Sequence, residues 1–216
     1  MTHTRAFNPI IAAAAVFVAA FSAAESDGAE LSQNWMLCVN KNVIFSRDLA
    51  ISGCTAIIQS GRETERNLAM AFNNRGTAYS DKKDYDRAIT DYSEAIRLNG
   101  NYATAFSNRG VAYRAKGEFD RAVADYSEAI RLNPKHARAF NNRGLAYSDM
   151  KNYERAIADY DEALRLDPGY ANAFNNRGDA YWAKGDVDRA FADYNRASRI
   201  DRELPPKAKA TADVRI

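Results

Sequence analysis

The sequence predicts an all-α fold, a solenoid of antiparallel helix pairs, and three observations support this prediction. The first is a recurring stretch whose glycine returns at a constant spacing, at Gly76, Gly110, Gly144 and Gly178. A constant period of about 20–50 residues indicates a repeat architecture. The second is that apolar residues inside each period follow three- and four-residue spacings, the period of an α-helix. The third is a helix-ending residue near the close of each of the first three periods: Gly100, Pro134 and Pro168.

The N-terminal segment, residues 1–24, differs from the rest of the chain. Arg5 gives a basic start, residues 10–20 are a continuous apolar run, and small residues follow up to Ala24. This layout predicts a secretory signal peptide over residues 1–24 and therefore a periplasmic or secreted protein. The alternative is an uncleaved membrane anchor, but the apolar run is short for a bilayer span. We expect no membrane span after the signal is removed.

Residues 25–68 are interpreted as a polar leader and a degenerate helical hairpin over 35–60, which caps the N-terminal end of the solenoid. A polar linker over 60–67 follows the hairpin. The two cysteines of the chain, Cys38 and Cys54, both fall within the hairpin. In an exported protein they are interpreted as one disulfide, and their spacing suits a bond between the two antiparallel helices of the hairpin. The alternative is a pair of small buried thiols at a helix contact.

Four regular units follow at 69–102, 103–136, 137–170 and 171–204, and residues 205–216 form a C-terminal tail. The first helix of the first unit carries Phe72, Gly76 and Tyr79 on one stripe, and its second helix carries Ala88 and Tyr92. Because Gly76 and Ala88 are small, we expect the two helices to approach closely there, with the aromatic rings filling the space around them.

This pattern resembles that of the tetratricopeptide repeat family, of a bacterial exported type. The family motif asks for a large residue, Leu-Gly, Tyr, Ala, an aromatic residue, Ala and Pro. The third unit supplies these positions as Phe140, Arg143-Gly144, Tyr147, Ala156, Tyr160, Ala163 and Pro168. The chain departs from the motif in having Arg in place of Leu before every glycine. The resemblance covers residues 69–204 closely and 35–68 loosely. It implies a right-handed superhelix whose first helices line a concave groove.

Composition and motifs exclude several function classes. The chain has 30 basic and 28 acidic residues, and this balance argues against a nucleic-acid-binding surface, which needs clustered Lys and Arg. The sequence contains no Gly-rich phosphate loop, no His/Cys cluster with metal-ligand spacing and no nucleophile–base pair. We therefore expect no enzymatic activity, no bound metal and no cofactor.

An arginine and an aspartate recur at a fixed separation in every unit. A catalytic pair is needed once, whereas a pair present in each repeat indicates a structural role. We therefore predict partly buried Arg–Asp bridges between the two helices of each repeat. The four predicted pairs are Arg75–Asp91, Arg109–Asp125, Arg143–Asp159 and Arg177–Asp193.

Asparagines stand before the Arg-Gly of each unit, on the side of the first helix opposite the apolar stripe. In the family this position faces the concave surface, where amides hold the backbone of an extended peptide, since an amide offers one acceptor and two donors. The alternative is a tolerated polar residue on a solvated face. We also expect Arg114 and Arg138 to meet an acidic group, and Trp182 to stack on an aromatic or sugar ring. The predicted asparagines are Asn73, Asn74, Asn108, Asn141, Asn142, Asn175 and Asn176.

These observations predict a protein–protein interaction module that binds an extended peptide or partner segment in an Asn-lined groove. The family's carboxylate-binding groove needs Lys or Arg where this chain has Asn73 and its equivalents, so an acidic chaperone tail is not the expected ligand. One alternative is an accessory protein that binds carbohydrate or envelope polymer. Another is an assembly scaffold or dimer formed through the outer face of the fourth repeat, which includes Phe191 and Ile200.

Overall fold

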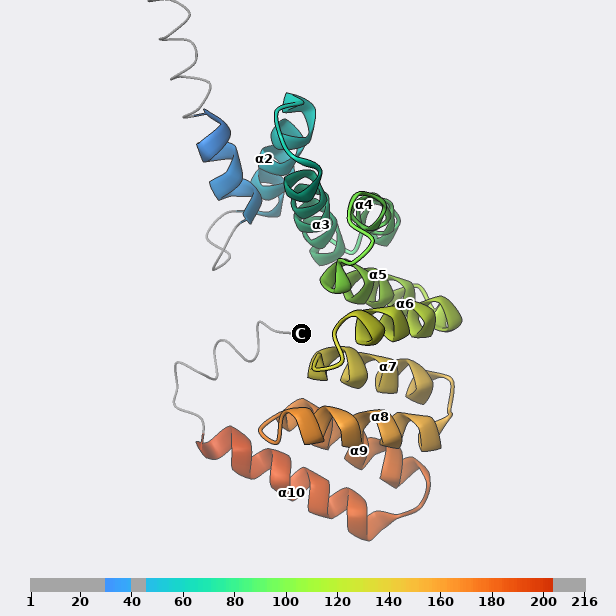
Figure 1. The fold of residues 1–216 in the computed structure, drawn as a ribbon. Coiled ribbons are helices and arrows are strands. Elements are labelled where there is room, and N and C mark those ends of the chain that lie inside the picture. Colours follow the sequence, from blue (N-terminus) through green and yellow to red (C-terminus); the bar gives the residue numbers. More distant parts are fainter. Residues whose placement is uncertain (1–29, 40–45, 204–216) are drawn as a thin grey trace, which may run out of the picture.

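The computed structural model describes residues 30–39 and 46–203 (Figure 1). The predicted signal peptide (1–24) and C-terminal tail (205–216) lie outside these residues. Within them the chain forms helices and no strands, and helix pairs follow one another in chain order along a curve. The all-α solenoid is therefore confirmed. A helix over residues 30–39 is followed by α2 (Arg47–Ser60), α3 (Glu65–Asp81), α4 (Tyr85–Leu98), α5 (Ala103–Ala115), α6 (Phe119–Leu132), α7 (Ala137–Asp149), α8 (Tyr153–Leu166), α9 (Ala171–Ala183) and α10 (Val187–Glu203).

The predicted linker over 60–67 is shorter in the structure. Helix α3 begins at Glu65, because the Thr64 side chain accepts a hydrogen bond from the backbone N–H of Asn67 and so caps the helix. The first helix of the first repeat therefore starts before the predicted boundary at 69. A capping threonine followed by Glu and Arg was the available sequence signal for this start.

The core of each repeat is a tyrosine ring packed over a glycine. Tyr92, Tyr126 and Tyr160 are among the largest fully buried side chains, and alanines make up most of the remaining core. A Cβ atom at Gly144 would lie 2.6 Å from Cε1 of Tyr160, and one at Gly76 would lie 2.8 Å from Cε1 of Tyr92. The glycine is thus required because the ring of the second helix occupies the space of its missing side chain.

The four Arg–Asp pairs are present as two-pronged ion pairs. Arg143 donates from Nε and Nη2 to the two carboxylate oxygens of Asp159, at 2.8 and 2.7 Å. Its third nitrogen, Nη1, donates to Ser127 Oγ of the preceding repeat at 3.0 Å. Hydrogen bonding to Asp159 raises the pKa of Arg143. The other three pairs have the same geometry, and each arginine reaches back to the preceding second helix: Arg75 to Thr55, Arg109 to Ser93 and Arg177 to Asp161.

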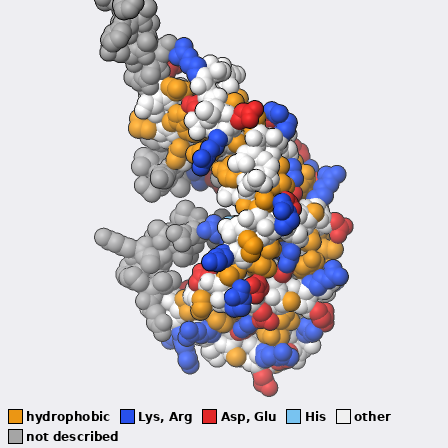
Figure 2. Space-filling view, in the orientation of Figure 1, with side chains coloured by type: hydrophobic (Ala, Val, Ile, Leu, Met, Phe, Trp, Pro, Cys, Tyr) orange, Lys and Arg blue, Asp and Glu red, His pale blue; other side chains and the backbone are white. Residues whose placement is uncertain are grey.

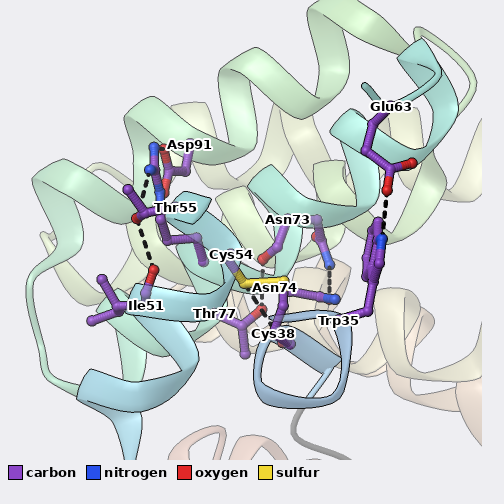
Figure 3. Close-up of a disulfide and its surroundings, with 11 residues drawn as sticks. Trp35, Cys38, Ile51, Cys54, Thr55, Glu63, Asn73, Asn74, Thr77 and Asp91 are labelled. Atoms are coloured by element: carbon purple, nitrogen blue, oxygen red, sulfur yellow. Dashed lines mark hydrogen bonds and ion pairs between the residues drawn. A yellow bond between two sulfur atoms is a disulfide. The ribbon is translucent and has the colours of Figure 1, made fainter. Parts of the chain in front are cut away.

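The N-terminal hairpin is cross-linked to itself and tied to the first repeat (Figure 3). Cys38, in the helix over 30–39, and Cys54, in α2, form a disulfide with an S–S distance of 2.13 Å. Trp35 Nε1 donates to Glu63 Oε1 at 2.6 Å, just before α3 begins. Arg47 forms an ion pair with Asp81 of α3 at 2.8 Å. The hairpin thus packs on the N-terminal side of the first repeat and covers it.

Opening the disulfide is expected to loosen this cap. The loop that it closes is short, so the chain-entropy model gives a stabilisation of about 3 kcal/mol. We expect Cys54→Ser, or reduction of the wild-type chain, to lower the melting temperature. Reduction should have a smaller effect on the Cys54→Ser variant, because that variant has no bond left to lose. Free alkylation of both thiols before reduction, in protein purified from its native compartment, would contradict the prediction.

Candidate functional site: the concave groove

One groove of about 730 Å³ runs along the inner side of the curve. Side chains of α2, α3, α5, α7 and α9 line it, together with Tyr92 from α4 and Tyr126 from α6. Apart from the cap helix α2, the main lining helices are the first helices of the four repeats. Basic and acidic side chains are interspersed over the face of the molecule seen in Figure 2. The groove lining itself combines amide, hydroxyl and apolar side chains with the charged residues Arg47, Asp81, Arg114 and Arg138.

The predicted asparagines divide into two groups in the structure. Asn74, Asn108, Asn142 and Asn176 are half-buried and line the groove. Asn73 is only 5% exposed and is absent from the groove lining, so the prediction that it faces a ligand is wrong. Asn141 is 3% exposed, although it belongs to the groove lining. Asn175 is exposed and lines the groove.

The buried asparagines hydrogen-bond to the next repeat. Asn108 Nδ2 donates to Asn73 Oδ1 at 3.0 Å, and Asn176 Nδ2 donates to Asn141 Oδ1 at 2.8 Å. The equivalent residue of the second repeat is Ser107, whose side chain is too short to replace the amide. Within the described chain, Asn142 Nδ2 therefore has no protein acceptor, although Asn142 Oδ1 accepts from Asn141 at 3.4 Å. The junction of repeats two and three thus presents a free amide donor to the groove.

A different contact joins the second and third repeats. Arg114 Nε donates to Asp149 Oδ2 at 2.6 Å, so the acidic group that Arg114 meets belongs to its own chain. Arg47 and Asp81 make the equivalent contact between the cap and the first repeat. The Asn–Asn bonds therefore join repeats one to two and three to four, but not two to three. Arg138 is exposed, lines the groove and forms no ion pair within the described residues.

Three buried polar atoms near the centre of the stack lack a partner in the described chain: Nδ1 of His136 and the hydroxyls of Tyr126 and Tyr160. In the first repeat, Tyr92 donates its hydroxyl proton to Thr77 at 3.3 Å. Val111 and Leu145 replace that threonine in the next two repeats and offer no acceptor. Burial, followed by the charge of Arg138, lowers the pKa of His136. The imidazole is therefore neutral near pH 7, and Arg138 is the local positive charge.

Two further expectations on the fourth repeat are corrected. Trp182 is 54% exposed but does not line the groove, because no following repeat extends the concave wall past α9 in the described chain. Its ring meets Phe191 of α10, with a centroid distance of 6.1 Å. Ile200, predicted to lie on the bare outer face with Phe191, is buried. It lies on the opposite side of α10 from Phe191, since the separation between them is about two and a half helical turns.

The described residues offer little for other kinds of chemistry. Among them, no group of three or more His, Cys, Asp or Glu side chains is placed to hold a metal ion. No helix of this part of the chain is long and apolar enough to cross a bilayer. What the groove does offer is amide groups, hydroxyls, the apolar side chains of Val111 and Leu145, and the cation of Arg138.

Models of repeat families match most of the described chain. A family described as "Tetratricopeptide repeat" matches residues 137–170, and a second family of the same description matches 171–204. A family described as "TPR repeat" matches residues 76–113 and 110–151. Together these matches run without a gap from residue 76 to residue 204. A search of curated proteins finds no match.

Solved structures with the same fold include several repeat proteins. The crystal structure of MamA is 26% identical, with a TM-score of 0.65, over 76% of this chain and 91% of that one. The first TPR domain of Spaghetti (RPAP3), bound to the HSP90 peptide SRMEEVD, is 26% identical with a TM-score of 0.54, over 57% of this chain and 96% of that one. YrrB, described as a TPR protein with an unusual peptide-binding site, is 20% identical with a TM-score of 0.61, over 84% and 88%. The YrrB likeness bears on the fold alone.

Proposed function

Because the chain belongs to the tetratricopeptide repeat family, we propose that it is a non-catalytic protein–protein interaction module whose groove binds an extended segment of a partner. The observation that carries the proposal is the row of amide side chains along the groove, at least one from each first helix. An amide can donate to and accept from a peptide unit whatever the side chain of that unit is. The RPAP3 domain, which is similar to this chain, holds a peptide.

The centre of the groove supplies the strongest contacts for such a segment. Asn142 has a free amide nitrogen there, and Val111 and Leu145 are apolar side chains of the same groove lining. Arg138, one turn before Asn142 on α7, is an unpaired cation on the same wall. We propose that a ligand places a backbone carbonyl at Asn142, an apolar side chain at Val111 and Leu145, and a carboxylate at Arg138.

Removing the two polar groups of α7 is expected to weaken this binding. The probe is a peptide selected from a displayed random library against the wild-type chain and titrated by calorimetry. Each lost hydrogen bond is worth about 0.5–1.5 kcal/mol, and more where a charge takes part. We expect the double variant Asn142→Ala/Arg138→Ser to raise the Kd at least tenfold, since about 1.4 kcal/mol is a factor of ten. Its melting temperature should stay close to that of the wild type.

The matched control is Arg131→Ser on α6, an exposed arginine outside the groove lining. It should leave the affinity for the selected peptide unchanged. Asn108→Ala is a less suitable variant, because it also removes the donor to the buried oxygen of Asn73. An unchanged affinity in the Asn142/Arg138 variant would refute binding at this point of the groove. Binding of polysaccharide, with no peptide selected, would instead favour the carbohydrate alternative.

A further inference from the structure

The outer face of α10 is built like the faces that other repeats bury. In the first repeat, Tyr85 and Ile89 of α4 pack against the core cluster that contains Ala112 of the following α5. Tyr153 and Ile157 of α8 pack in the same way against the cluster with Ala180 of α9. Val187 and Phe191 occupy the same two repeat positions on α10. No helix follows them in the described chain.

These side chains remain apolar and exposed. Phe191 is 55% exposed, Val187 is 43% exposed and Trp182 of α9 is 54% exposed. Their rings are ordered against one another, since Phe191 makes edge-to-face contacts with both Trp182 and Tyr194, at 6.1 and 6.5 Å. The last repeat of a solenoid normally ends on a polar face. An ordered aromatic patch in its place indicates a surface that a partner covers.

The charges of α10 depart from the repeat pattern in one respect. In α4, α6 and α8 a glutamate is followed three residues later by an arginine with which it forms an ion pair. On α10 the glutamate is replaced by Arg196, so Arg199 has no such partner. Asp188, near the start of α10, also forms no ion pair within the described residues. Along its exposed side the helix therefore carries an unpaired acid in its first turn and unpaired bases in its second half.

This distribution is complementary to itself in one orientation only. Asp188 and Arg199 are separated by about three turns of an α-helix, so both lie on one side of α10 with Phe191 between them. Two copies of α10 packed antiparallel bring each Asp188 towards the other copy's arginines. A parallel arrangement would oppose like charges. A two-fold interface needs such a self-complementary surface, in which each residue meets its counterpart reciprocally.

We propose that the chain forms a two-fold dimer in which α10 packs antiparallel against α10 of a second copy. Phe191, Val187 and Trp182 form the apolar centre of the interface, and Asp188 pairs with Arg199 of the second copy on either side of it. The groove lies on the first helices of the repeats and stays open in this dimer. One dimer would therefore present two grooves, which increases the effective affinity for a partner with two binding segments.

Sedimentation equilibrium of the full chain at micromolar concentration tests the proposal. The wild type is expected to have twice the mass of one chain. Phe191→Glu, and separately Asp188→Arg or Arg199→Asp, should each raise the dimer Kd at least tenfold. The double variant Asp188→Arg/Arg199→Asp should recover most of the wild-type affinity, because it exchanges the two charges. Asp120→Arg, the same position on α6 as Asp188 on α10, is the matched control and should not change the mass.

Recovery by the charge exchange also separates a broken interface from a misfolded chain, and circular dichroism melts of each variant give the independent check. A wild-type chain that stays monomeric at high micromolar concentration would overturn the proposal. So would a dimer that tolerates Phe191→Glu. If the full chain is monomeric and a chain ending at Glu203 dimerises, residues 204–216 cover the face in place of a second copy, and the proposal is wrong.

Discussion

Gly144→Leu is expected to lower the free energy of unfolding by about 1–3 kcal/mol or more, the usual cost of overpacking a core. A Cβ atom at this position would lie 2.6 Å from Tyr160 Cε1 and 3.1 Å from the carbonyl oxygen of Ala156. The ring has little room to move, because Tyr160 is fully buried. Replacing a helical glycine would by itself stabilise the helix by roughly 0.5–1 kcal/mol. The steric clash therefore has to exceed this gain, and two contacts to buried atoms make that the expected result.

Thermal and denaturant melts measure the effect, with two controls. Gly100→Ala adds a Cβ in open space, since nothing beyond its chain neighbours lies within 4 Å of it, and should be nearly neutral. Asn142→Ala removes a groove side chain whose amide nitrogen donates no hydrogen bond within the described chain. It should therefore lower the free energy of unfolding by much less than Gly144→Leu does. If Gly144→Leu and Asn142→Ala melt at the same temperature, the assignment of the two faces of α7 is inverted.

The repeat period was sufficient to predict the helices, the close Gly–Tyr approach and the Arg–Asp pairs. Each of these depends on residues that recur at every period, so four copies of the same pattern support one interpretation. The start of α3 at Glu65 was missed because it belongs to a single capping threonine, Thr64, which has no counterpart in the other units.

The groove was predicted less well, because its contacts depend on differences between repeats. Asn73 and Asn74 are neighbours on α3, yet one bonds to the next repeat and the other faces the groove. A hydrophobic stripe fixes the helix face only to within about one residue, since successive residues are about 100° apart. The contrast of Ser107 with Asn73 and Asn141 was visible in the sequence. It becomes informative only when the distance between adjacent repeats is known.

The central junction of the stack lacks the Asn–Asn bond that its two neighbours have. Amide bonds connect repeats one to two and three to four, whereas the Arg114–Asp149 ion pair connects two to three. The two interfaces that use Asn–Asn bonds have satisfied amides, and the central one leaves an amide donor free. Under the proposed function, a ligand would supply the missing acceptor at Asn142, and Asn74 at the junction with the cap has a free amide nitrogen of the same kind.

Arg143→Leu is expected to have the largest effect of any single substitution considered for this chain. It leaves the carboxylate of Asp159, a buried side chain, without its two hydrogen-bond donors. Breaking a buried ion pair by removing one partner typically costs about 3–5 kcal/mol, because an uncompensated charge stays in a poorly solvated site. The variant also loses the bond to Ser127 and the contact of the guanidinium with the Phe140 ring, 5.7 Å away.

A second substitution in the same ion pair distinguishes two causes of the lost stability: the unpaired Asp159 carboxylate and the lost contacts of Arg143. Removing the carboxylate as well, in Arg143→Leu/Asp159→Leu, is expected to restore most of the stability, since a buried ion pair replaced by apolar side chains is often close to neutral. Arg165→Leu is the surface control: its ion pair with Glu162 is exposed, so its loss should change the free energy of unfolding very little. Denaturant melts of the three variants decide the matter. A double variant no more stable than Arg143→Leu would mean that the bond to the preceding repeat, and not the buried charge, is what Arg143 contributes.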